Sequence, residues 1–243
     1  MHWVYLSPHF DDAIYSCGAA IWLQGQSGER VEIWTICAGD PPPQHPLTPF
    51  ASQLHARWGL SGQGVEARRA EDAAACARVG AMARPFAIPD CIYRYDPSSG
   101  QPMVQDEQGL WASANHPEPW LVDQLADQLG RQLPGTAQVA APLAIGSHTD
   151  HWLVRLAAQK LGLRLWYYPD VPYVMRNPPG WEGYSSASSI TPERLSAAAI
   201  EIWQQAAADY ASQLTTFWPN RAALDAAFEL YARQGGGRLL QLP

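Results

Sequence analysis

The stretch LSPHFDD, residues 6–12, joins an apolar run to one histidine and two adjacent aspartates. The apolar residues 3–7 predict a strand that is buried on both faces and that Pro8 brings to an end. Apolar residues recur at near-helical spacing over 11–24, and a second apolar run follows at 31–39. A strand, a helix and a strand in this order indicate a βαβ unit, which implies a parallel sheet with a right-handed crossover.

The rest of the chain continues this alternation of strand and helix patterns. The proline-rich segment 40–64 predicts a long loop, and we expect it to border the site as a rim or lid. We find no internal repeat and no linker composition. We therefore predict a single Rossmann-like α/β domain over 1–243, with a mostly parallel sheet and helices on both faces. Its core is expected at about 2–170 and a C-terminal helical part at about 171–243. Further strands are predicted at 86–90, 137–146 and 163–169, and further helices at 64–81, 117–133, 151–162, 192–208 and 219–234.

Composition and charge narrow the class of protein. The 243 residues are 47% hydrophobic and 16% charged, which is typical of a globular domain. A net charge of −7 and the lack of any basic run argue against nucleic acid as a partner. The four cysteines are far apart and form no CxxC pair, which favours reduced thiols and a cytoplasmic location. We expect no signal peptide, because strand-like residues begin at His2 without a positively charged and apolar leader pattern. We expect no membrane span, because no run approaches about 18 apolar residues. A homo-oligomer is compatible with the sequence but is not indicated by it.

A second cluster of metal-binding residue types, GSHTDH at 146–151, follows the strand predicted at 137–146. Ligands bind beyond the carboxyl ends of the strands in open parallel sheets, so the two clusters are expected to converge. His9, Asp12 and His151 could then hold one metal ion through two imidazoles and a carboxylate, leaving a fourth position for water as in catalytic zinc sites. Zinc lowers the pKa of that water to about 7 and polarises a carbonyl oxygen.

Three further residues of the two clusters are candidates for catalytic roles. Asp11 could accept a proton from the water without binding the metal, and a protonated His148 could stabilise the oxyanion or protonate the leaving group. Asp150 could orient one of the histidines. Each cluster taken alone also has a simpler interpretation. Asp11 and Asp12 could cap a helix, and His148 and His151 could be polar loop residues.

Four segments of the chain match motifs of a known family. SPHFDDAIYSCG (7–18) and GSHTDHWLV (146–154) carry a paired HxDD and HxDH pattern, which is specific. RRAEDAAACARVGA (68–81) and YASQL (210–214) match weaker RxxE…A…LG and Y-x-S-Q patterns. On these residues the chain resembles the LmbE/PIG-L family of zinc-dependent N-deacetylases from residue 4 to about residue 215.

The resemblance implies hydrolysis of the N-acetyl group of an N-acetylglucosamine-type sugar or conjugate, giving acetate and a free amine. It also implies one zinc ion per chain, with other divalent metals such as Fe²⁺ as alternatives. Phe10 and Ala13 stand where the family has a proline and a glutamate, and neither change removes a ligand or the base. The resemblance implies that His9, Asp12 and His151 bind the metal. It implies that Asp11 is the general base and that His148 is the oxyanion or acid histidine.

Four more residues are candidates for binding the substrate. Arg68 stands where the family places an arginine facing the substrate, although a solvated helix face is an alternative. Asp90 and Arg94 follow a predicted strand and could bind sugar hydroxyls, or they could stabilise a turn. Tyr173, after a later strand, could shape the mouth of the pocket or fill the core. The tryptophans in loop-like surroundings are candidates for stacking on a sugar: Trp58, Trp111 and Trp181.

Two other classes of function compete with a deacetylase. The chain could be a non-catalytic α/β domain that binds a sugar or nucleotide, although no GxGxxG turn follows the first strand. It could also be a metal-dependent hydrolase of another amide or ester. A two-metal phosphoesterase would need more ligands than the strand ends supply.

Overall fold

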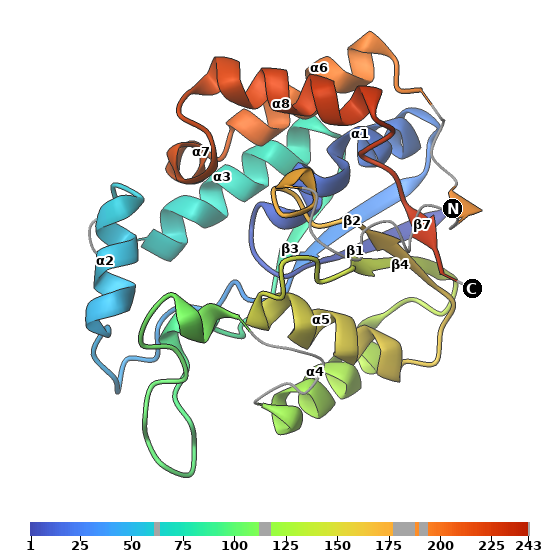
Figure 1. The fold of residues 1–243 in the computed structure, drawn as a ribbon. Coiled ribbons are helices and arrows are strands. Elements are labelled where there is room, and N and C mark those ends of the chain that lie inside the picture. The colour runs from blue at the N-terminus through green and yellow to red at the C-terminus, as the bar shows by residue number, and fades with distance from the viewer. Residues whose placement is uncertain (61–63, 112–117, 177–187, 190–193, 243) are drawn as a thin grey trace.

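The computed structural model of the protein describes residues 1–60, 64–111, 118–176, 188–189 and 194–242. Strands from both halves of the chain form one sheet in the order β3-β2-β1-β4-β5-β7-β6 (Figure 1). The neighbours from β3 to β5 pair in parallel, while β7 is antiparallel to β5 and β6. The strands are β1 (His2–Ser7), β2 (Arg30–Thr35), β3 (Met82–Pro85), β4 (Ala137–Pro142), β5 (Leu165–Tyr168), β6 (Ser188–Ser189) and β7 (Leu240–Gln241).

The central strand shows why the sheet is covered on both sides. In β1, Trp3 and Tyr5 belong to one hydrophobic cluster, whereas Val4 and Leu6 belong to another. Because successive side chains of a strand point to opposite faces, the continuous apolar run needs a helical layer on each face. The prediction of a Rossmann-like α/β fold with a mostly parallel sheet is confirmed.

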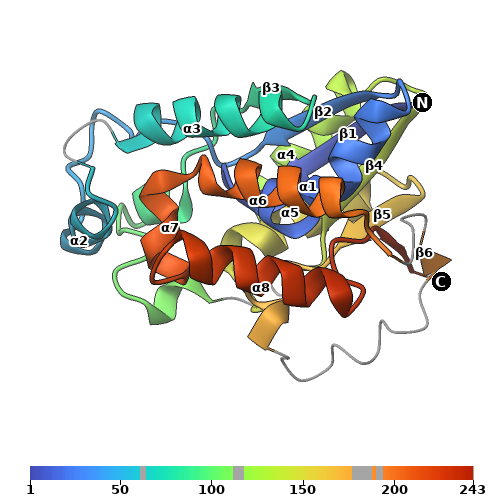
Figure 2. The same ribbon diagram turned by 90° about the horizontal axis from the view of Figure 1, so that it is seen from above.

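Two helical layers enclose the sheet. One face is covered by α1 (Asp12–Gln26), α3 (Gly64–Arg78), α6 (Ala197–Ala208) and α8 (Arg221–Arg233), and the other by α4 (Pro119–Gln132) and α5 (Thr149–Lys160) (Figure 1). Seen from above, α3, α6 and α8 run side by side over their face (Figure 2). None of the described helices is long and apolar enough to cross a membrane.

The segment 40–64, predicted as a loop throughout, contains the helix α2 (Pro49–Arg57). Proline is well tolerated in the first turn of a helix, and the Thr48 side chain caps α2 by accepting a hydrogen bond from Ala51 N. The proline count alone therefore misled the prediction. A further short helix, α7 (Ala211–Phe217), was not predicted.

The strand predicted at 86–90 was misplaced, because β3 ends at Pro85. Beyond it the chain continues beside the end of β2 with only an isolated bridge between Gly39 and Pro89. β3 lies at the edge of the sheet, where a proline without an N–H is tolerated. Gly39 is required here, because a Cβ atom on it would lie 2.3 Å from the carbonyl oxygen of Ala87.

The order of the strands fixes where a ligand can bind. The chain leaves β1 toward β2 on one side and returns through β4 on the other, which makes the β1–β4 boundary the topological switch point. The N-terminus lies at the right in Figure 1, so the carboxyl ends of the parallel strands face left, toward α2.

Candidate active site

The turn between β1 and α1 is fixed by short hydrogen bonds. The Ser7 hydroxyl donates to the carbonyl oxygen of His9 (2.6 Å) and accepts from Ala13 N (3.1 Å), and His9 N donates to Asp12 Oδ2 (2.8 Å). Asp11 occupies the N-cap position of α1, but its side chain makes no capping hydrogen bond. The carboxylate of Asp11 is therefore available for another role.

Asp12 joins the two clusters that the sequence placed at different strand ends. Its Oδ2 lies 3.2 Å from His9 Nδ1, and its Oδ1 lies 3.3 Å from His151 Nε2. His148 completes the group, because one ring nitrogen from each of His9, His148 and His151 lies within 4.8 Å of the others. The expected convergence of residues from the ends of β1 and β4 is thus present in the structure.

In both His9 and His151, the ring nitrogen that does not face Asp12 contacts another buried carboxylate. His9 Nε2 lies 3.0 Å from Asp150 Oδ2, and His151 Nδ1 lies 2.6 Å from Asp170 Oδ1. Burial disfavours the charged form of His151, but Asp12 and Asp170 outweigh it and raise its pKa to about 10. Carboxylates in this position fix the orientation of metal-binding histidines and raise their basicity.

These donors fit a divalent metal ion. Asp12 places one oxygen beside each of two imidazole nitrogens, and the carboxylates behind them leave those nitrogens facing Asp12. Imidazole and carboxylate together suit zinc and other first-row divalent ions. Two overlapping groups of possible ligands lie around the same position: Cys91, His148 and Asp150, and His9, Asp90 and Asp150.

Asp11 lies beside a buried arginine. Its Oδ1 is 3.6 Å from Arg68 Nη2, and both side chains are buried. Burial and the neighbouring Asp12 raise the pKa of Asp11 to about 6, while Arg68 opposes this shift. The Arg68 guanidinium lies over the Trp58 ring, 4.9 Å from its centroid, which positions the cation beside the carboxylate. Asp11 is thus a carboxyl group whose proton affinity suits general-base catalysis near neutral pH.

His148 begins α5 and is the N-cap of that helix. Its Nδ1 accepts a hydrogen bond from Asp150 N (3.2 Å). Burial, with His9 and His151 next to it, lowers the pKa of His148 well below its usual value. A neutral ring whose Nδ1 is an acceptor carries its proton on Nε2. The geometry therefore favours a neutral hydrogen-bond donor over the protonated imidazole expected from the sequence.

The turn that carries His148 contains left-handed backbone. Ala144 and Ser147 have φ of 57° and 63°, values that cost a non-glycine residue energy. Gly146, at φ 88°, must be a glycine, because a Cβ atom on it would lie 2.5 Å from Cγ of Tyr173. Asp170 Oδ2 accepts a hydrogen bond from Ile145 N (2.9 Å) and so also supports this turn.

Asp150 and Arg94 lie behind the site. Arg94 Nη1 is 2.7 Å from Asp150 Oδ1, and Arg94 Nη2 is 2.6 Å from Glu118 Oε2, with all three side chains buried. Asp150 Oδ2 also accepts a hydrogen bond from Cys91 N (3.0 Å). The guanidinium of Arg94 is committed to these partners, and the residue does not line the pocket, unlike the direct contact with substrate expected from the sequence.

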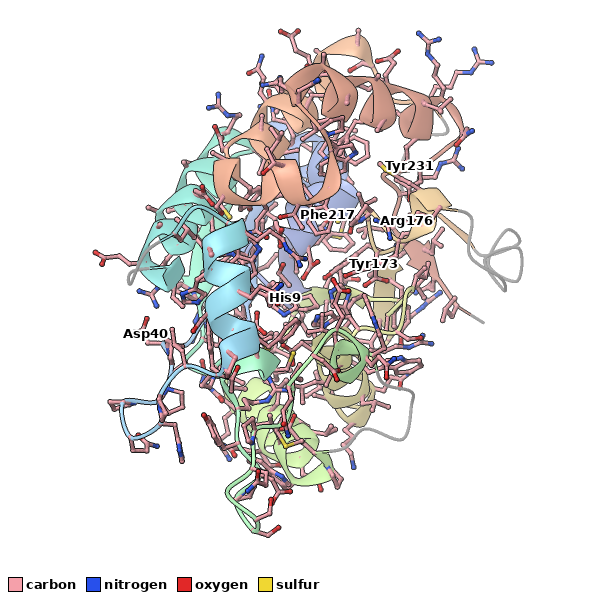
Figure 3. The ribbon with its side chains drawn as sticks, turned by 60° about the vertical axis from the view of Figure 1, so that its left-hand side comes forward. His9, Asp40, Tyr173, Arg176, Phe217 and Tyr231 are labelled. Carbon is pink, nitrogen blue, oxygen red and sulfur yellow. The ribbon has the colours of Figure 1, made fainter. Side chains whose placement is uncertain are left out.

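A pocket with a volume of about 260 Å³ opens over these groups. Leu54 and Arg57 of α2, together with Trp58, form part of its wall, so the second half of the 40–64 segment borders the site. Phe217 and Tyr173, which Figure 3 labels together with His9, also line the pocket. Ten of the predicted residues line it: His9, Asp11, Asp12, Trp58, Arg68, Asp90, Trp111, His148, His151 and Tyr173.

Other residues of the pocket were not predicted. Tyr15 comes from the helix after the HxDD motif, and Gln213, Thr216 and Phe217 come from α7. Gln213 belongs to the YASQL segment, which was the one sequence signal for this wall. Trp181, a predicted stacking residue, lies outside the described residues.

The two weaker motifs prove to be neighbours. Glu71 of the RxxE pattern accepts hydrogen bonds from the backbone N–H of Ser212 (2.8 Å) and from its hydroxyl (2.6 Å). Ser212 belongs to the Y-x-S-Q pattern, so this contact fastens the start of α7 to α3. It thereby places Gln213 and Phe217 at the pocket wall.

Comparison with known proteins identifies the family. The sequence pattern of the PIG-L family, described as GlcNAc-PI de-N-acetylase, matches residues 4–161. The chain belongs to this family, and the class of enzyme that its fold and site define is a deacetylase.

Several proteins that match most of the chain are deacetylases. The 2′-N-acetylparomamine deacetylase of Niallia circulans is 25% identical over 217 residues, which cover 82% of this chain and 78% of the relative. A deacetylase–teicoplanin complex is 26% identical with a TM-score of 0.82, over 99% of this chain and 98% of the other. The A40926 pseudoaglycone deacetylase is 29% identical with a TM-score of 0.73, over 98% and 95%. The zinc-inhibited form of teicoplanin deacetylase is 27% identical with a TM-score of 0.79, over 99% and 97%.

Proposed function

We propose that the protein is a zinc-dependent N-deacetylase that hydrolyses the N-acetyl group of an N-acetylglucosamine-type sugar within a larger conjugate. The observation that carries the proposal is that Asp12 places its two oxygens beside His9 Nδ1 and His151 Nε2. The neighbouring Asp11 side chain makes no capping hydrogen bond. The relatives named above, which include an N-acetylparomamine deacetylase and teicoplanin deacetylases, support the choice of substrate class.

His9, Asp12 and His151 would hold the metal ion. His148 belongs to the same compact group of imidazoles, but its Nδ1 already accepts a hydrogen bond from Asp150 N. The proton on Nε2 then leaves no lone pair to bind a metal, which favours Asp12 over His148 as the third ligand. When bound, zinc supplies Lewis-acid polarisation of a carbonyl oxygen and lowers the pKa of water.

Of the remaining residues of the site, Asp11 would transfer the proton and His148 would stabilise the developing negative charge. Asp11 accepts a proton from the water that attacks the acetyl carbon, and the Nε2–H of His148 donates a hydrogen bond to the carbonyl oxygen as it gains negative charge. The proton on Asp11 then passes to the departing nitrogen, and acetate and a free amine are released. Arg68 keeps the Asp11 pKa from rising further, so the base is ionised near neutral pH.

Asp150 and Arg94 act through other residues. Asp150 orients His9 through its Nε2, and Arg94 and Glu118 hold Asp150 in place. Asp90 and Tyr173 line the pocket and would contact the sugar. All the cysteines are free and buried, which agrees with a reducing cytoplasm.

The test is an assay of amine and acetate release by the zinc-loaded protein. The substrates are N-acetylglucosamine, its β-glycosides and N-acetylated glycopeptide conjugates. We expect equal amounts of acetate and amine from at least one conjugate, and loss of both products in Asp11→Asn. Zinc at one ion per chain with no product from any substrate would overturn the proposal. Binding of a sugar without turnover would instead favour a binding domain.

A further inference from the structure

Trp111 is a large exposed aromatic side chain on the lining of the pocket. It follows the short helix η2 (Gln108–Leu110), and 46% of its surface is exposed. Trp58, the other tryptophan of the lining, is half-buried and has Arg68 packed over its ring. Among the described residues of the pocket, Trp111 therefore offers the open indole surface.

The position of Trp111 is fixed by the catalytic side of the pocket. Its ring meets those of His148 and Tyr173 nearly at right angles, with centroids 5.8 and 6.0 Å apart. Its backbone also pairs with His148 in an isolated antiparallel bridge. An aromatic side chain that is already held in place loses little conformational entropy when a ligand stacks on it.

The size of the pocket indicates what reaches Trp111. A volume of about 260 Å³ lies just below the ~300–1,000 Å³ usual for ligand pockets, so it has room for little more than one sugar. The proposed function places the acetyl group at His9 and His151, which line the pocket. Whatever is attached to the sugar must then pass other residues of the lining, among which the half-buried Leu110 and Phe217 provide apolar surface.

We propose that Trp111 is a specificity-determining residue that stacks on an aromatic aglycone attached to the amino sugar. The inference rests on the proposed function for the position of the sugar. An aromatic group is favoured over an alkyl chain because a flat indole surface held by perpendicular neighbours provides an offset-stacking partner. An alkyl chain would gain only from the buried area.

The experiment compares aglycones on one sugar. Zinc-loaded protein is assayed with the methyl, octyl and phenyl β-glycosides of N-acetylglucosamine. We expect the wild-type protein to favour the phenyl glycoside in kcat/KM, and Trp111→Ala to reduce this advantage roughly 2- to 10-fold, mainly through KM. Trp120→Ala is the matched control, because Trp120 is 47% exposed on α4 and does not line the pocket.

A binding measurement separates this inference from the proposed function. Phenyl and octyl β-glucosides lack the acetamide, so their binding, followed by calorimetry, does not depend on deacetylation. We expect Trp111→Ala to weaken the phenyl glucoside selectively, whatever the catalytic assay shows. A selective loss of the octyl compounds would replace the aromatic group by an alkyl chain and overturn the proposal. Equal decreases of kcat/KM for all three N-acetylglucosamine glycosides in Trp111→Ala would show that Trp111 only positions His148. Unchanged binding of both glucosides would show that Trp111 does not contact the aglycone.

Discussion

Asp12 Oδ1 lies 3.3 Å from His151 Nε2, although the two residues follow different strands of the sheet. The contact exists because β1 and β4 are neighbours at the point where the strand order reverses. The other oxygen of Asp12 faces His9, so this one carboxylate connects both halves of the proposed metal site.

Replacement of Asp12 by alanine should remove metal and activity together. Only three protein ligands are proposed, and loss of one leaves an incomplete site. Elemental analysis after dialysis should find about one zinc ion per wild-type chain and far less in Asp12→Ala. Asp123→Ala, at an exposed carboxyl group on α4, serves as the control. An Asp12→Ala chain that retained one ion at wild-type affinity would refute the ligand assignment.

Asp11→Asn should keep the metal while losing most of kcat. The change preserves shape but removes the proton acceptor, and general-base catalysis typically contributes about 10²–10⁴-fold. Steady-state kinetics and zinc content measured on the same sample check both parts. Loss of zinc in Asp11→Asn would identify Asp11 as a ligand, contrary to the proposal.

Arg68 should influence the pH at which kcat/KM rises. The pKa of Asp11 is raised to about 6 by burial and Asp12, and Arg68 lowers it. The base must be ionised, so kcat/KM should rise with pH through about 6. Arg68→Gln removes the cation, so the carboxylate should lose stabilisation and the rising limb should move to higher pH. A limb that stays in place in Arg68→Gln would mean that another group controls it.

Arg94→Ala should destabilise the protein without a selective effect on KM. It would remove the buried guanidinium that contacts both Asp150 and Glu118, and breaking a buried ion pair costs about 3–5 kcal/mol. Arg57→Ala is the comparison, because Arg57 lines the pocket and its ion pair is with the exposed Glu107. Denaturant unfolding and Michaelis kinetics on both variants provide the measurements. A large rise in KM with unchanged stability would restore Arg94 as a residue that contacts substrate.

The fold was predictable where the sequence pattern is continuous. The apolar β1 and the alanine-rich α3 were recognised because burial dictates their composition. α2 was missed because prolines crowd its approach, and α7 because its seven residues are too few for a clear period. β6 and β7 have two residues each and depend on contacts with β5 and each other, which no local pattern records.

The site was predictable to the extent that its residues share short motifs. His9, Asp11 and Asp12 are close in sequence, so one turn positions all three. The choice between a substrate-binding and a structural role for Arg94 could not be made from the sequence, because its partners Asp150 and Glu118 are distant along the chain. The sequence also could not distinguish Trp111 from Trp58 as a stacking residue. Arg68 covers the ring of Trp58, and this is a tertiary contact.

Asp72 should make the stability of the protein depend on pH. This carboxyl group is buried on α3 and accepts hydrogen bonds from Tyr210 Oη (2.8 Å) and Thr35 Oγ1 (3.0 Å). Burial outweighs these bonds and raises its pKa from 3.8 to about 7. Between about pH 4 and pH 7 the folded chain therefore binds more protons at Asp72 than the unfolded chain does. The free energy of unfolding should then fall as pH rises through this window.

The variant Asp72→Asn tests this dependence, because it keeps a neutral group of similar shape. Each pKa unit corresponds to about 1.4 kcal/mol, so the wild-type chain should lose on the order of 4 kcal/mol relative to Asp72→Asn between pH 4 and pH 7.5. Urea unfolding at several pH values measures the difference, with Asp123→Asn as the exposed control. Tyr210→Phe should raise the pKa of Asp72 and extend the pH range of this effect to higher pH, since it removes a hydrogen bond that stabilises the carboxylate. Parallel stability curves for the wild-type and Asp72→Asn chains would show that the hydrogen bonds outweigh burial and that Asp72 stays ionised in the folded protein.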